Sequence, residues 1–199
     1  MKRGVKKHQA TIGAIRIISG QWRGRKLPVL DAQGLRPTTD RNKETLFNWL
    51  MPYTSNSYCL DVFAGSGGLG FEALSRYATS VTFIELDKQA AKNLQQNANL
   101  LKVSAQQARI ITGDAAQVLI QLTQAFDIIF LDPPFHQNLL ATTVEQIEQA
   151  QLLKKGGVIY IECEGQGENY AVPDTWQLIK QNQSKQITSR LYQRSNDSN

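Results

Sequence analysis

The fold is decided by Asp61-Val62-Phe63-Ala64-Gly65-Ser66-Gly67-Gly68-Leu69-Gly70, in which a strand, a tight glycine turn and a helix start follow one another. Glycines let the backbone approach a ligand closely, and the first N–H groups of a helix have no partners within it. Gly65, Gly67 and Gly70 also have the GxGxxG spacing of dinucleotide-binding folds. The alternative is a purely structural turn between strand and helix.

Around this turn the chain alternates short apolar runs with segments of helical periodicity, which is typical of an α/β fold with a parallel sheet. Strands are predicted at residues 58–63, 81–85, 109–112, 126–131 and 158–163. Helices are predicted at residues 41–51, 69–76, 88–101, 115–122 and 139–150, with Gly156-Gly157 closing the last one. The alternating runs 176–180 and 186–192 predict a terminal antiparallel hairpin at the sheet edge.

Two acidic residues stand beyond the carboxyl ends of predicted strands, where open α/β sheets bind ligands. Glu85 ends the second strand, twenty positions after Gly65, and a carboxylate there accepts hydrogen bonds from both hydroxyls of a ribose. Asp114, in Gly113-Asp114-Ala115 after the third strand, either accepts from an adenine amino group or caps the following helix. Asp87 is expected to cap a helix. The pattern indicates an adenosine-containing cofactor, and NAD is not excluded.

A second motif, Asp132-Pro133-Pro134-Phe135, directly follows the apolar run 126–131 and therefore lies at the same sheet edge. An exocyclic amine on a base is a poor nucleophile, because its lone pair is delocalised into the ring. Hydrogen bonds from the amine to the Asp132 carboxylate and the Pro133 carbonyl tilt the nitrogen toward tetrahedral geometry, while Phe135 stacks on the base. The motif favours methylation of a nucleobase amine over hydride transfer.

Basic residues are concentrated near the N-terminus. Residues 1–43 hold 11 Lys or Arg and two Asp, a charge of +9, whereas the remaining 156 residues carry −4. Short strands at 15–19 and 26–30 predict a basic hairpin there. This arm indicates a polyanionic partner, although a merely solubilising tail is the alternative. The candidate nucleic-acid contacts are Trp22, for stacking on a base, and the cations Arg23, Arg25, Lys26, Arg36 and Arg41.

Composition excludes other classes. No apolar run approaches the roughly 20 residues of a membrane-spanning helix, and residues 1–11 lack the apolar segment of a signal peptide. Cys59 and Cys163 have no CxxC spacing and fall in predicted strands, so we expect reduced core thiols, a cytoplasmic protein and no metal site. We expect two parts: a basic arm and hairpin at 1–40, which contacts nucleic acid, and a main domain at 41–199.

With both motifs placed, residues 41–193 resemble the class I S-adenosylmethionine-dependent methyltransferases that act on amines and carry D-P-P-[FY]. A narrower resemblance, to the RsmD family, extends over nearly the whole chain. It rests on Arg16-Ile17-Ile18-Ser19-Gly20, Arg23-Gly24-Arg25-Lys26-Leu27, Gly34-Leu35-Arg36-Pro37-Thr38, Asp40-Arg41 and Lys43-Glu44-Thr45-Leu46-Phe47-Asn48. Ser19-Gly20 stands where the family often has two glycines. That family methylates the N2 amine of a guanine in 16S ribosomal RNA.

The resemblance implies a Rossmann-like, doubly wound, mostly parallel sheet of seven strands whose last strand is antiparallel. It implies S-adenosylmethionine as the methyl donor and the small ribosomal subunit as the partner, and we expect a monomer. The donor-binding residues are then Asp61, Gly65, Gly67, Glu85, Leu86, Asp114 and Ala115, with Leu86 packed against adenine. The catalytic residues that hold the guanine are Asp132, Pro133, Pro134 and Phe135.

Several alternatives remain open on the sequence. A DNA adenine-N6 or cytosine-N4 methyltransferase uses the same turn, although the chain has no room for a large target-recognition domain. A protein-glutamine methyltransferase is expected to have Asn in place of Asp132. An NAD-dependent dehydrogenase is favoured only by the glycine motif and Glu85. An RNA-binding ribosome-assembly factor without turnover is the alternative outside the enzymes. Arg36 and Arg41 could also serve internal ion pairs.

Overall fold

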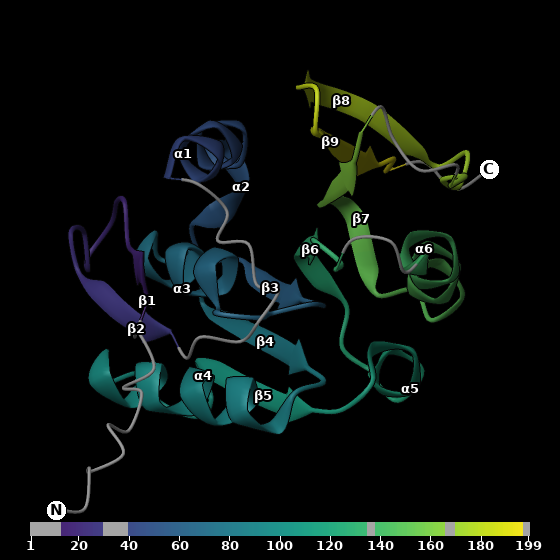
Figure 1. Ribbon diagram of the computed structural model, residues 1–199. Helices are drawn as coiled ribbons and strands as arrows, with labels where there is room; N and C mark the ends of the chain where they lie inside the picture. Colours follow the sequence, from purple (N-terminus) through teal and green to yellow (C-terminus); the bar gives the residue numbers. More distant parts are fainter. Residues whose placement is uncertain (1–12, 30–39, 135–137, 166–169, 197–199) are drawn as a thin grey trace, which may run out of the picture.

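The central element is a mixed sheet with the strand order β5-β4-β3-β6-β7-β9-β8 (Figure 1). The computed structural model describes residues 13–29, 40–134, 138–165 and 170–196. Five strands run parallel, and β9 is antiparallel to both of its neighbours, β7 and β8. The strands are β3 (Tyr58–Asp61), β4 (Ser80–Glu85), β5 (Ala108–Thr112), β6 (Phe126–Leu131), β7 (Leu153–Glu164), β8 (Trp176–Gln183) and β9 (Ile187–Arg194).

This order confirms the doubly wound α/β fold expected from the sequence. From β3 the chain moves outward through β4 to β5, and it then crosses back to place β6 on the other side of β3. The strand order therefore reverses between β3 and β6, and such a switch point opens a crevice at the carboxyl ends of the strands. The terminal hairpin is also confirmed, because β8 and β9 complete the sheet at one edge.

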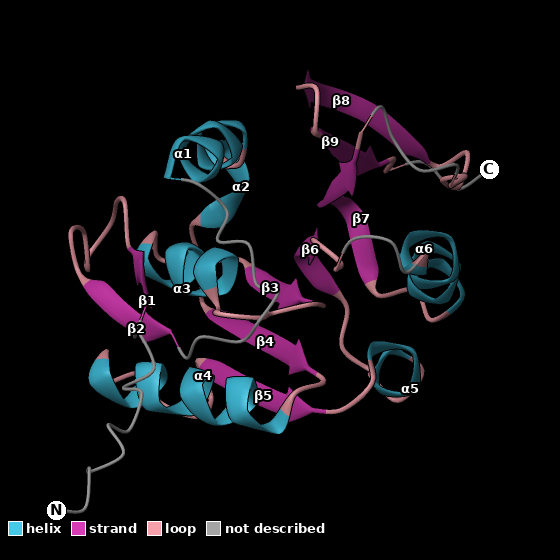
Figure 2. Cartoon of the chain, viewed as in Figure 1, coloured by secondary structure: helices cyan, strands magenta, loops and turns pink. Residues whose placement is uncertain are grey.

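Helices cover both faces of the sheet, and each face has its own hydrophobic cluster. One face is covered by α1 (Asp40–Trp49), α2 (Met51–Thr54), α3 (Gly68–Ser75) and α4 (Lys88–Leu100), the other by α5 (Ala115–Leu119) and α6 (Leu139–Gln149) (Figure 2). Successive β6 residues alternate between these clusters, with Phe130 on the first face and Ile129 on the second. Because both faces are buried, the strand is a continuous apolar run rather than an alternating one.

The basic hairpin, β1 (Gly13–Arg16) and β2 (Lys26–Val29), forms a separate antiparallel ribbon in which Ile15 pairs with Leu27. Ile15, Ile17 and Leu27 are buried in the same cluster as α1 and α3. An isolated two-stranded ribbon is marginally stable at best in water, so this burial is what holds the ribbon in place. Its other side remains available to carry exposed cations.

One helix end was predicted wrongly. Gly156 and Gly157 do not close α6; they lie within β7, opposite a register shift of β6 between Phe126 and Ile128. The helix instead ends through Gln151, whose φ of 50° is in the left-handed region, with the Leu152 N–H donating to the Ile147 carbonyl at 3.0 Å. A glycine pair within a β-bulge and a glycine pair after a helix look alike in the sequence. Only the pairing of β7 with β6 distinguishes the two cases.

Cys59 in β3 and Cys163 in β7 are buried free thiols, as expected. No helix in the described ranges is long and apolar enough to cross a membrane. The described side chains also contain no group of three or more His, Cys, Asp or Glu that could hold a metal ion.

Candidate active site at the carboxyl edge of the sheet

A cavity of about 1290 Å³ lies over the carboxyl ends of the strands, at the switch point of the sheet. Its lining brings together the two sequence motifs, because it includes Gly65 and Glu85 from the first half of the fold and Asp132 from the second. The basic hairpin contributes Arg16 and Lys26 to the same lining. The cavity is therefore large enough for a cofactor and a second molecule side by side. Arg16 and Lys26 can interact with the negative charges of a polyanion bound there.

Glu85 joins the end of β4 to the glycine turn. One of its carboxylate oxygens accepts the Gly65 N–H at 2.7 Å, and the other accepts the Asp87 N–H at 2.8 Å. A carboxylate has about four acceptor positions, so two remain for hydroxyl donors such as those of a ribose. Asp87 caps α4 by accepting from the N–H groups of Gln89 and Ala90, as expected.

Asp61, at the end of β3, is buried beneath this turn and accepts the Gly70 N–H at 3.1 Å. Burial raises the pKa of its carboxyl to about 7; the charge of Glu85 adds to the rise and the Gly70 N–H opposes it. Asp61 also lines the cavity. A carboxyl whose pKa is near neutrality gains or loses its charge according to what binds beside it.

Two glycines, one at the turn and one in the first turn of α3, are required for packing. Gly67, with a φ of 80°, is the residue before α3, and an added Cβ there would lie 2.6 Å from side-chain atoms of Leu94 and Phe71. A Cβ on Gly70 would lie 2.1 Å from the Phe83 ring. Among the described residues that line the cavity are Gly65, Ser66 and Gly68 of this segment, but not Gly67. A side chain at Gly67 would therefore clash with the protein interior, which explains the glycine without deciding whether its backbone contacts the donor.

The remaining donor-binding candidates also border the cavity. Asp114 caps α5 by accepting the Gln117 N–H at 3.2 Å, and Asp114 and Ala115 both line the cavity. The cap uses one carboxylate oxygen, so capping and ligand contact, the two alternatives left open by the sequence, are compatible at Asp114. Leu86 is 68% exposed and also lines the cavity. An exposed leucine beside a cavity suits the face of a planar ring.

Asp132, Pro133 and Pro134 line the opposite part of the cavity, directly after β6. Pro133 is buried and Pro134 exposed, so the prolines anchor the turn on one side only. The negative charge of Asp132 contributes to raising the pKa of the Tyr160 hydroxyl on β7, after burial and the neighbouring Glu162. Phe135, the expected stacking residue, lies outside the described residues.

The sequence reasoning missed two buried ionic residues beside the site. Glu162, 4% exposed on β7, lines the cavity, and its signal in the sequence is a charge within the apolar run 158–163. Glu72, fully buried on α3, accepts the N–H groups of Ile18 and Ser19 at 2.8 and 3.0 Å. Glu72 thereby fixes the chain just after β1 to α3.

Lys43 and Arg76 complete the surroundings of Glu72. The Arg76 Nε donates to Glu72 at 2.8 Å, and the Lys43 Nζ lies 3.8 Å from the same carboxylate and donates to the Arg16 carbonyl. Burial lowers the pKa of Lys43, and the charge of Glu72 opposes this. Lys43 also lines the cavity, so the ionic cluster extends from the hairpin to the active site.

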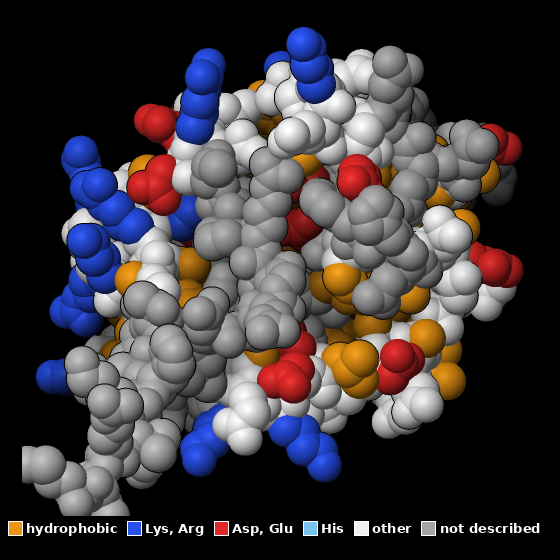
Figure 3. Space-filling view, viewed as in Figure 1, with side chains coloured by type: hydrophobic (Ala, Val, Ile, Leu, Met, Phe, Trp, Pro, Cys, Tyr) orange, Lys and Arg blue, Asp and Glu red, His pale blue; other side chains and the backbone are white. Residues whose placement is uncertain are grey.

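The predicted nucleic-acid contacts differ in exposure. Arg23, Arg25 and Lys26 are exposed on the hairpin, and Lys and Arg side chains gather over this end of the molecule in Figure 3. Trp22 is half-buried and packs against the core, and its backbone N–H donates to the Ser75 hydroxyl at 3.0 Å. Arg41 is exposed in the first turn of α1. Arg36 lies outside the described residues.

The family described as conserved hypothetical protein 95 matches residues 15–193. The chain belongs to this family, the RsmD family. A member from Haemophilus influenzae, named ribosomal RNA small subunit methyltransferase D, is 51% identical over 183 residues, which cover 91% of this chain and 94% of that protein. The protein of the same name from Escherichia coli K12 is 48% identical and covers 92% of this chain and 91% of its own length.

A solved bacterial structure has the same fold. The structure of yhhF from Escherichia coli aligns with a TM-score of 0.85 at 45% sequence identity, and the match covers 93% of this chain and 100% of that chain. The chain therefore shares its fold with this relative over nearly the full length of both chains.

Proposed function

We propose that the chain methylates the exocyclic N2 amine of a specific guanine in 16S rRNA of the small ribosomal subunit, with S-adenosylmethionine as the methyl donor. The observation that carries the proposal is that Glu85 with its glycine turn and Asp132-Pro133 line one cavity. The names of the two bacterial relatives support it, because both refer to methylation of small-subunit ribosomal RNA.

The residues of the first motif suit the donor. Bound here, S-adenosylmethionine supplies a methyl group on a positively charged sulfur. Glu85 has acceptor positions left for the ribose hydroxyls, and Leu86 offers an apolar surface for adenine. Asp114, which lines the cavity, is proposed to accept from the adenine amino group. Asp61 gains stability as an anion when a cation binds beside it, since its pKa lies near neutrality in the free protein.

The residues of the second motif act on the base. The Asp132 carboxylate and the Pro133 carbonyl accept the two N–H groups of the amine, so its lone pair turns away from the ring and toward the methyl group. The proline pair holds that carbonyl in a fixed direction. The amine proton becomes acidic once the nitrogen is alkylated, and it can leave to water without a strong base. Phe135 is proposed to stack on the base.

The hairpin is proposed to hold the RNA, with residues 1–40 as the RNA-contacting part and 41–199 as the methyltransferase domain. Arg23, Arg25 and Lys26 are exposed and can neutralise phosphates. A base must leave its stack to enter the cavity, and single-stranded loops of RNA offer such bases at the lowest cost. We further propose that the protein acts as a monomer in the cytoplasm, with 16S rRNA or the small subunit as its partner.

The test is methyl transfer from labelled S-adenosylmethionine to unmodified small subunits, naked 16S RNA and duplex DNA in parallel, followed by identification of the nucleoside. The proposal predicts N2-methylguanosine from a ribosomal substrate. N6-methyladenine or N4-methylcytosine in DNA would keep the chemistry and overturn the substrate. Donor binding without transfer to any substrate would favour an assembly factor that binds RNA without turnover.

A further inference from the structure

A second carboxylate stands beside Asp132 on the neighbouring strand. Leu131 of β6 pairs with Ile161 of β7 in parallel register, and Asp132 and Glu162 each follow directly. Side chains at equal register on adjacent parallel strands point to the same face of the sheet. Asp132 therefore begins the turn next to the position of Glu162, and both residues line the cavity.

Glu162 is held in a defined direction by a buried pair of hydroxyls. The Tyr160 hydroxyl donates to the Glu162 Oε2 at 2.5 Å, and the Ser189 Oγ lies 3.1 Å from the same tyrosine oxygen. Tyr160 is 1% exposed, and Ser189 pairs with Glu162 across β7 and β9. Burial, followed by the charge of Glu162, raises the pKa of Tyr160 well above its usual value, so the tyrosine remains a donor.

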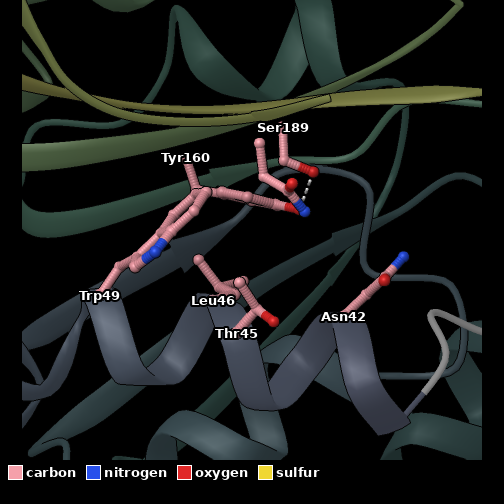
Figure 4. A pocket seen from close by; sticks show the side chains of 7 residues that line it. Asn42, Thr45, Leu46, Trp49, Tyr160 and Ser189 are labelled. Atoms are coloured by element: carbon pink, nitrogen blue, oxygen red, sulfur yellow. Dashed lines mark hydrogen bonds between the residues drawn. The ribbon is translucent and has the colours of Figure 1, made fainter. Parts of the chain in front are cut away.

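The hydroxyl pair is itself packed against α1. Figure 4 shows Tyr160 and Ser189 across a small cavity of about 10 Å³ from side chains of α1, including Leu46 and Trp49. Because Tyr160 is buried in a close-packed interior, it has little freedom to swing away from Glu162. This arrangement fixes the position of the carboxylate at the cavity wall.

A buried carboxylate is stable where hydrogen-bond donors reach it, and the Tyr160 hydroxyl is one such donor to Glu162. A guanine presents two adjacent groups of donors on its Watson–Crick edge, the N1–H and the N2 amine. Adenine and cytosine present a ring nitrogen with a lone pair beside their amine instead. Next to a carboxylate, the first pattern is attractive and the second repulsive.

We propose that the Glu162 carboxylate accepts the N1–H of the target guanine, while Asp132 and Pro133 hold its N2 amine. This inference rests on the proposed guanine-N2 methylation and assigns the choice of base to a residue of this chain. Glu162 is then a specificity residue, and Tyr160 and Ser189 are positioning residues behind it. A polar group placed to receive one hydrogen bond rejects a base that lacks the donor, because the group is left unpaired.

The test compares guanine with 2-aminopurine, which keeps the 2-amino group and has an acceptor in place of N1–H. After the methylated nucleotide is mapped, 16S RNA carrying either base at that position is assembled into small subunits. We expect the wild-type protein to prefer guanine in kcat/KM by about tenfold or more. Glu162→Gln should reduce this preference by about tenfold, since an amide can donate to the 2-aminopurine ring nitrogen.

Controls separate this role from a structural one. Glu145→Gln, an exposed change of the same kind on α6, should leave the preference unchanged. Tyr160→Phe, which keeps the carboxylate and removes its hydrogen bond, should reduce the preference in the same direction and serves if Glu162→Gln does not fold. An unchanged preference in a folded, donor-binding Glu162 or Tyr160 variant overturns the inference alone. Failure of the wild-type protein to form N2-methylguanosine overturns the proposed function and this inference with it.

Discussion

The Glu85 carboxylate accepts the backbone N–H of Gly65 at 2.7 Å, across twenty residues of sequence. The bond joins the end of β4 to the turn after β3, so the proposed ribose acceptor and the glycine turn form one structural unit. We expect Glu85→Gln to weaken S-adenosylmethionine binding by about 10- to 100-fold, because the amide cannot accept from both backbone N–H groups and the ribose. Isothermal titration calorimetry measures this change.

The matched control for this change is Glu145→Gln, an exposed Glu→Gln substitution on α6. It should bind the donor with the affinity of the wild-type protein. Donor affinity that stays within about twofold in Glu85→Gln would move the ribose contact to another residue, with Asp114 as the next candidate on the cavity wall.

Asp132→Ala separates binding from chemistry. The change removes one of the two acceptors proposed to hold the target amine, and it leaves the Glu85 part of the cavity intact. We expect turnover on the ribosomal substrate to fall by about a hundredfold or more, with the donor affinity within about twofold of the wild-type value. Single-turnover kinetics with labelled donor measure the first quantity and calorimetry the second. Substantial turnover in this variant would remove the central mechanistic claim.

How much of this site the sequence predicted depends on where each residue lies. Glu85 and Asp132 were predictable because each ends an apolar run, and the carboxyl ends of parallel strands meet at one edge. Glu162 lies inside a predicted strand. The surroundings of a charged residue there can be inferred only when the register of β7 with β6 and β9 is known. Gly67 has the right spacing for ligand contact, but its second role, leaving room for Leu94 and Phe71, depends on tertiary packing and could not be predicted.

The order of strands and helices was predicted more completely than the end of α6 and the attachment of the N-terminal hairpin. Strand and helix order follows from local periodicity, whereas the end of α6 depends on Gln151 adopting a left-handed conformation that its residue type does not favour. The attachment of the hairpin also escaped prediction, because it depends on Glu72, more than fifty residues away from Ile18 and Ser19. Contacts at that separation leave no periodic signal in the chain.

Because Glu72 holds the N-terminal hairpin to α3, we expect its replacement to lower the stability of the protein substantially. Glu72→Gln replaces a fully buried carboxylate that accepts from Ile18, Ser19 and Arg76. An amide keeps one acceptor oxygen and turns its NH₂ toward other donors, so we expect a loss of roughly 2–4 kcal/mol in the free energy of unfolding. Urea denaturation measures it. A loss below about 1 kcal/mol would show that the cluster contributes little to holding the hairpin.

Asp61 predicts a pH dependence of stability in the protein without donor. Its pKa is about 7 in the folded state, chiefly because of burial, whereas a carboxyl in the unfolded chain ionises near pH 4. Between about pH 4 and pH 7 the folded state therefore binds the proton more tightly, and stability falls as the pH rises. Asp61→Asn keeps an acceptor for Gly70 and cannot ionise.

The measurement is the free energy of unfolding of both proteins from pH 5 to pH 8. We expect Asp61→Asn to gain stability relative to the wild-type protein across this range, by on the order of 3 kcal/mol at the upper end. Saturating donor should reduce the difference, because a bound cation favours the ionised Asp61. Parallel stability curves for the two proteins would mean that the carboxyl is already ionised at pH 5.

The exposed cations of the hairpin predict how RNA binding responds to salt. Each guanidinium that neutralises a phosphate contributes about 0.7–0.9 to the slope of log K against log salt concentration. Replacing Arg23 and Arg25 by Gln should therefore lower that slope by about 1.4–1.8 and weaken binding of 16S RNA at low salt. Replacing Lys180 and Lys185 by Gln removes the same charge from the exposed part of the terminal hairpin and should leave the slope nearly unchanged. Filter binding over a range of salt concentrations measures both, and equal slopes for the two double variants would place the RNA on another face.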